Sequence, residues 1–96
     1  MEEKFSMGDI VLSKAGRDSG RYFVVVAVDG IFVYICDGDL HKIDKPKKKK
    51  IKHVKPTEGK SEYVAAKLVE ESKVTNTELR RAISEFEEQA LLMKNE

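Results

Sequence analysis

Two runs of residues in this chain are suited to binding an anionic ligand, and the first is the loop from Ala15 to Arg21. Its glycines permit positive φ angles and close approach of a backbone, and its arginines supply planar charges that fit phosphate oxygens. The run predicts a loop that grips a nucleic-acid backbone, although an ordinary β-turn with solvated charges accounts for it equally well. Its candidate contacts are Lys14, Gly16, Arg17, Gly20 and Arg21.

The second run is rich in lysine and extends from Lys45 to Lys55. Four successive lysines cannot share one face of a strand, so several of them point into solvent or towards a bound polyanion. Contacts to phosphates would weaken with salt, by about 0.7 to 0.9 log units per log unit of salt for each contact. A solvated loop, or lysines that keep an edge strand from pairing, explains the run equally well. Its candidate contacts are Lys47, Lys48, Lys49, Lys50, Lys52 and His53.

Other reactive side chains are few. Cys36, His41 and His53 are the soft metal ligands of the chain, and their spacing matches no paired zinc pattern. Cys36 ends an apolar stretch, which favours a buried packing role. Asp37 and Asp39 flank a glycine, which indicates a turn rather than a catalytic pair of carboxylates. The sequence therefore predicts no metal, no cofactor and no enzymatic activity.

The elements that must position the two basic runs are short strands. The segments 10–13, 22–28 and 31–36 are rich in Val, Ile, Tyr and Phe, and Asp29-Gly30 predicts a type I′ turn between the last two. A further strand is expected around Leu40 to Ile43, and a fifth over 50–54, closed by Pro56 and Gly59. Five short strands in about 55 residues suggest a small barrel.

The hydrophobic period changes after Lys60 and predicts two helices. Glu62 to Ser72 carries apolar residues at helical spacing. Thr75 to Glu78 fits a capping box, so a second helix is expected to start there with its apolar face running from Leu79 to Met93. This helix is expected to pack on the barrel, with pairing to another chain or docking on a protein partner as alternatives. The fold class is thus mainly β with C-terminal α, in one domain of 96 residues: a barrel in 1–60 and a helical extension in 61–96.

The net charge of +1 hides an uneven distribution. Residues 1–60 hold 13 basic and 9 acidic side chains, whereas residues 61–96 hold 5 and 8, so a net +4 faces a net −3. Between His41 and Lys60 the net charge is +7. The near-neutral total therefore does not count against an RNA ligand.

The stretch Gly8-Asp9-Ile10-Val11, the loop that follows it and Tyr22-Phe23 resemble the KOW motif of ribosomal proteins and transcription elongation factors. The region from Met7 to Val54 is similar to small bacterial KOW-domain RNA-binding proteins, which resemble large-subunit ribosomal KOW proteins of archaea and eukaryotes. The resemblance implies an SH3-like barrel, makes Gly20 the glycine of the motif, and implies binding to RNA, in particular ribosomal RNA of the large subunit. The competing interpretation is a protein-interaction module of the transcription or translation machinery.

The hydropathy pattern also bears on location. The longest apolar run, Phe23 to Val28, is far too short to span a bilayer, and the acidic N-terminal residues do not resemble a signal peptide. With a single cysteine, the chain lacks the disulfide framework that is usual in small secreted domains. These features predict a cytoplasmic protein that does not insert into membranes.

Overall fold

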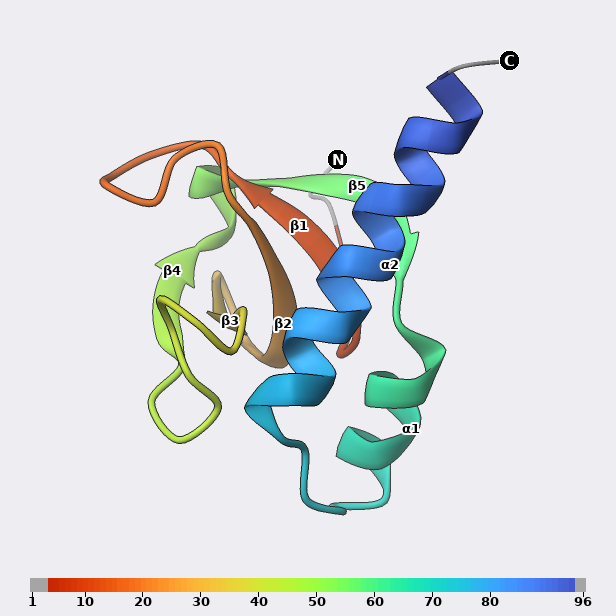
Figure 1. Ribbon diagram of the computed structural model, residues 1–96. Helices are drawn as coiled ribbons and strands as arrows, with labels where there is room; N and C mark the ends of the chain where they lie inside the picture. Colours follow the sequence, from red (N-terminus) through yellow and green to blue (C-terminus); the bar gives the residue numbers. More distant parts are fainter. Residues whose placement is uncertain (1–3, 95–96) are drawn as a thin grey trace.

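The computed structural model describes residues 4–94 and shows a five-stranded antiparallel sheet followed by two helices (Figure 1). The strands lie in the order β4-β3-β2-β1-β5, so the last strand returns to pair with the first. The loop between β1 and β2 carries the first basic run, and a tight turn joins β2 to β3. The elements are β1 Asp9–Ser13, β2 Tyr22–Asp29, β3 Phe32–Cys36, β4 Lys47–Lys50, the 3₁₀-helix η1 Ile51–His53, β5 Val54–Lys60, α1 Glu62–Val69 and α2 Asn76–Lys94.

The hairpin of β2 and β3 confirms the prediction for the centre of the sheet. Its turn differs in detail, because Asp29 pairs with Phe32 and the two central residues are Gly30 and Ile31. Gly30 has a φ of 61°, and Ile31 is not in the left-handed region. A type I′ turn needs positive φ at both positions, whereas type II′ needs it only at the first. The predicted turn type was therefore wrong, although its glycine is the residue that makes the turn.

The second half of the sheet differs more from the prediction. The lysine run itself forms β4, which pairs with β3, and the predicted strand over 50–54 is wrong because η1 occupies Ile51 to His53. Residues three apart lie on one side of a 3₁₀-helix, so Ile51 and Val54 can contact the same core cluster, whereas a strand would place them on opposite faces. β5 then continues through Pro56, which lies opposite Val11 at the edge of the sheet. Proline is tolerated there because an edge strand has one unpaired side.

The strand expected around Leu40 to Ile43 is absent, and the chain forms turns there. The carboxylate of Asp37 accepts hydrogen bonds from the amides of Asp39 and His41, at 3.0 and 2.9 Å. The amide of Ile43 donates to the side chain of Asn76 at 2.8 Å. These side-chain partners satisfy amides that would otherwise need a neighbouring strand.

Both faces of the sheet are buried, as β2 shows by alternation. Phe23 and Val25 contribute to one cluster of core residues, with Ile35 among its other members. Val24 points the opposite way, into a cluster that includes Leu79 of α2. The two helices therefore share a core with the sheet, as predicted, and Figure 1 shows α2 crossing one face while its last turns extend beyond the strands.

The helix starts agree with the sequence signals. Thr75 Oγ1 accepts from the amide of Glu78 at 3.2 Å, and the Glu78 carboxylate accepts from the amide of Thr75 at 2.9 Å, which confirms the capping box. α1 ends at Val69, shortly before the predicted end at Ser72. Among residues 4–94, no helix is both long and apolar enough to cross a membrane.

Candidate nucleic-acid interface

The two basic runs predicted from the sequence meet on one side of the sheet. The loop between β1 and β2 lies beside β4, and together with η1 they border an open hollow of about 740 Å³. Phe32 of β3 and Leu40 and His41 of the turn region complete its lining. Seven of the predicted contact residues line this hollow: Gly16, Arg17, Lys47, Lys48, Lys49, Lys50 and His53. Lys14, Gly20, Arg21 and Lys52 do not line it.

A buried ion pair joins the loop to β4. The Lys49 ammonium contacts the Asp18 carboxylate, and both side chains are less than a tenth exposed. Lys49 Nζ also donates to Ser13 Oγ and to the carbonyl of Ala15, each at 2.7 Å. All donors of the ammonium therefore have partners within the fold, and the loop is tied to a strand that lies more than 30 residues away in the chain.

The surroundings of Asp18 favour its ionised form. Burial acts to raise its pKa, but the hydrogen bonds from Lys49 and Ser13 and the charge of Lys49 outweigh it, so the pKa is lowered. His41 Nε2 also lies 3.3 Å from Asp18 Oδ2. The negative charge of Asp18 is thus neutralised from within and does not repel an anion in the hollow.

Lys49 therefore differs from its neighbours in the lysine run. It lies opposite Val33, a buried residue of β3, and opposite residues of an antiparallel pair share a face of the sheet. Its ammonium is committed to Asp18, which removes Lys49 from the set of predicted RNA contacts that are free to meet a ligand. The pairing register decides this, and four identical lysines carry no signal in the sequence that separates one from the others.

The other basic side chains at the hollow are exposed. We call Arg17, Lys47, Lys48 and Lys50 the lysine surface. Lys48 Nζ lies 4.2 Å from the centroid of the Phe32 ring, a cation–π contact that holds one ammonium over an aromatic face. Lys14 and Lys52 are also exposed. They lie near each other in the fold, because the Lys14 amide donates a hydrogen bond of 2.9 Å to the carbonyl of His53, the residue after Lys52.

Arg21 is directed away from the lysine surface. Its Nη2 lies 3.0 Å from Asp37 Oδ2 and 3.4 Å from Asp39 Oδ2. The hydrogen bond with Asp37 raises the pKa of Arg21. Asp37 also caps the turn described above, so Arg21 contributes to holding that turn, with about half of its own side chain exposed.

The glycines of the loop have the backbone conformation that their type suggests. Gly16 and Gly20 have φ values of 86° and 88°, which L-residues rarely adopt. A Cβ at Gly20 would meet no atom within 4 Å, so this position is open to the outside. Gly20 thus combines a backbone conformation that other residues rarely adopt with free space above the backbone, as a close approach of a ligand requires.

Two tyrosines of the sheet and the cysteine take part in core packing. Tyr22 packs edge-on against Phe86 of α2, with ring centroids 5.2 Å apart, and Tyr34 packs against the same cluster, and neither residue lines the hollow. Cys36 is fully buried, as predicted, and burial raises its pKa to about 12. Within residues 4–94, no three His, Cys, Asp or Glu side chains cluster in a way that could hold a metal ion.

Sequence reasoning missed the residues that assemble the hollow. Asp18, Ser13, Phe32 and His41 hold or line it, yet none of them was among the predicted contacts. Their roles depend on contacts between segments far apart in the chain, such as Asp18 with Lys49. A scan against models of known protein families finds no match to this chain, and a search among curated proteins finds none either.

Proposed function

We propose that this chain is a non-catalytic RNA-binding protein whose lysine surface contacts the phosphate backbone of structured RNA. The observation that carries the proposal is the meeting of the two basic runs around one hollow, with the carboxylate of Asp18 neutralised beneath them. Backbone contacts of this kind position a protein on nucleic acid without reading its sequence. The resemblance to KOW-domain proteins favours ribosomal RNA of the large subunit as the ligand.

We further propose that the sheet is a partly open barrel of the SH3-like type. The support is the strand order, in which β5 returns to pair with β1, and the short η1 turn that links the two edge strands β4 and β5. In this arrangement the loop between β1 and β2 and the strand β4 lie at one end of the barrel. The exposed position of Gly20 agrees with a motif loop that approaches RNA through its backbone.

The mechanism is electrostatic and predicts a measurable salt dependence. Each ammonium or guanidinium that neutralises a phosphate releases a counterion, which contributes about 0.7 to 0.9 to the slope of log affinity against log salt. Lys47, Lys48 and Lys50 are exposed and all three border the hollow, so each can neutralise a phosphate of a backbone that lies across it. Removing their charges should therefore reduce this slope by about 2 to 3.

The first test replaces Lys47, Lys48 and Lys50 with Glu and leaves Lys49 in place. Binding to purified large-subunit ribosomal RNA is measured by fluorescence anisotropy over a series of salt concentrations. We expect the affinity to fall about tenfold or more at moderate salt, because three attractive contacts become repulsive. Circular dichroism should be unchanged, since the buried ion pair is preserved.

A matched control makes the same change of charge elsewhere, at Lys60, Lys73 and Arg81. These residues lie on β5, before α2 and on α2, outside the hollow. We expect this variant to lose much less affinity than the first. Equal loss in both variants would show that only the total charge matters, and an unchanged salt slope in the first would overturn the assignment of the lysine surface.

A further inference from the structure

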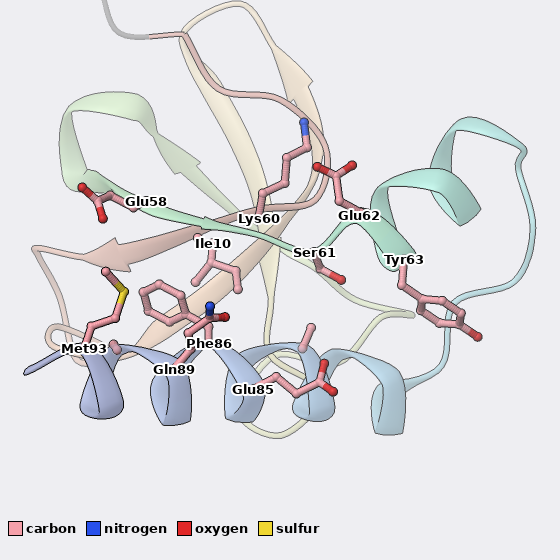
Figure 2. A pocket seen from close by; sticks show the side chains of 13 residues that line it. Ile10, Glu58, Lys60, Ser61, Glu62, Tyr63, Glu85, Phe86, Gln89 and Met93 are labelled. Atoms are coloured by element: carbon pink, nitrogen blue, oxygen red, sulfur yellow. The ribbon is translucent and has the colours of Figure 1, made fainter. Parts of the chain in front are cut away.

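A second hollow lies between α2 and the segment that runs from the end of β5 to the start of α1. It has a volume of about 710 Å³. Figure 2 shows Ile10 and Phe86 between β5 and α2, and Met93 extending from the last turns of α2 towards Glu58. We call this hollow the acidic groove.

The groove exists because α2 is longer than the surface it covers. Its first turns bury Leu79, Ala82 and Ile83 against the sheet. From Glu87 onward its described side chains are exposed, because the sheet and the eight-residue α1 do not reach them. The apolar residues Ala90 and Met93 are consequently exposed on the helix face that lines the groove.

A glycine on the opposite wall lets Phe86 pack directly against β5. Gly59 faces Phe86, and a Cβ at this position would overlap the Phe86 ring. Phe86 is held on its other side by Tyr22. The floor of the groove is therefore a fixed aromatic ring, and the fold does not fill the space above it.

The charges at the rim are mostly acidic. Glu58, Glu62 and Glu85 are exposed residues of the lining. Among the side chains that the structure describes, none of these three carboxylates takes part in an ion pair. The lining has one basic residue, Lys60, whose ammonium lies 4.0 Å from a carboxylate oxygen of Asp9. Figure 2 shows the side chains of Lys60 and Glu62 pointing away from α2.

We propose that the acidic groove binds a basic amphipathic helix of a protein partner. The apolar side chains of such a helix would cover Phe86, Ala90 and Met93, and its lysine or arginine side chains would reach the carboxylates at the rim. Charge complementarity selects this occupant, because an acidic or neutral apolar helix would leave the rim carboxylates without partners. This surface is separate from the lysine surface, so an RNA and a protein could be bound together.

The test uses two synthetic helical peptides of about 15 residues with the same leucine face, one with lysine and one with glutamine at the polar positions. Binding of each labelled peptide to the full chain is measured by fluorescence anisotropy. We expect the lysine peptide to bind about tenfold more tightly than the glutamine peptide. Equal binding of the two peptides would overturn the proposal.

Two variants locate the binding site. Replacing Glu58, Glu62 and Glu85 with Lys should remove the preference for the lysine peptide. The matched control replaces Glu70, Glu71 and Glu87, which are exposed outside the groove, and should retain the preference. A control that loses the preference to the same extent would show a non-specific effect of net charge, and would overturn the assignment.

The third variant, Ala90→Arg, places a bulky charged side chain in the groove at an exposed position of α2. We expect it to weaken both peptides while the fold is kept, which is checked by circular dichroism. Sedimentation of the free protein tests the alternative occupant, a second copy of this chain. A dimer that Ala90→Arg dissociates, and that excludes the lysine peptide, would replace the proposed partner with self-association. Because the RNA assay concerns the lysine surface, either proposal can fail without the other.

Discussion

The lysine surface and the acidic groove carry opposite charges, and the fold uses those charges in different ways. Beneath the lysine surface, one lysine and one aspartate are buried together and join two distant segments. At the acidic groove the carboxylates are exposed at the rim, and the structure is held by apolar packing of Phe86 and the first turns of α2. The region beneath the lysine surface therefore needs the ion pair of Lys49 and Asp18 to keep its structure, whereas the carboxylates of the acidic groove are exposed and do not hold the structure together.

This difference between the two regions determines which charged residues can be replaced without loss of stability. A buried ion pair costs desolvation energy, and removing one partner leaves the other charge uncompensated. An exposed carboxylate keeps its water, so its removal costs little. Residues of the same type, even neighbours such as Lys48 and Lys49, therefore have different tasks.

The largest effect is expected from Lys49→Met. This change leaves the ionised Asp18 buried with Ser13 and His41 as its remaining partners, and should lower the free energy of unfolding by about 3 kcal/mol. Urea denaturation at neutral pH measures it. The counterpart in the groove, Glu85→Met, should alter stability by no more than about 0.5 kcal/mol.

A control on the same strand is Lys50→Met, since Lys50 is exposed and Lys49 is not. We expect it to behave like Glu85→Met in stability while it weakens RNA binding. If Lys49→Met and Lys50→Met were equally mild, the buried ion pair would not hold the loop, and the contrast between the two regions would fail.

The sequence predicted the parts of the fold that depend on local signals. The hairpin glycine, the capping box at Thr75 and the apolar face of the first turns of α2, up to Phe86, were correct because propensity, turn chemistry and helical period act within a few residues. The rest of that face, with Ala90 and Met93, was expected to pack but is exposed. The strand at Leu40 to Ile43 was wrong because Asn76, far away in the chain, binds the amide of Ile43. The type of the β2–β3 turn and the position of η1 depended on register, which the pattern left open.

The candidate site was predictable in composition but not in arrangement. Charge counting located the loop and the lysine run, and the structure brings them together. Which lysine turns inward depends on the pairing of β4 with β3, and which arginine is engaged depends on the position of Asp37. Both are tertiary facts, and no spacing in the sequence encodes them.

A smaller effect is expected from acid, and it sharpens the role of Asp18. The pKa of Asp18 is lowered in the folded state, so its ionised form contributes stability above its unfolded pKa of about 3.9, and this contribution is lost as the pH falls through the folded pKa. Lys49→Met removes the partner that lowers the pKa. The difference in stability between wild type and this variant should therefore shrink as the pH falls from about 7 towards about 2.

Urea denaturation of both proteins across this pH range provides the measurement. Other carboxylates that titrate in acid, such as Glu78 with its pKa lowered to about 2 by Lys67 and Tyr63, are present in both proteins and cancel in the difference. A difference that stays constant with pH would mean that the cost of Lys49→Met comes from lost packing rather than from the charge of Asp18.

A small effect on stability is also expected at Arg21, an exposed residue that is paired with a buried carboxylate. Arg21 is about half exposed, but its partner Asp37 is buried and keeps two backbone hydrogen bonds when the guanidinium is removed. Arg21→Gln should therefore cost less than about 1 kcal/mol in urea denaturation. Because its guanidinium is already engaged, the change should also weaken RNA binding less than Arg17→Gln, whose side chain is exposed at the hollow. An RNA loss at Arg21 as large as at Arg17 would extend the lysine surface around the loop to Asp37 and would show that RNA competes with this ion pair.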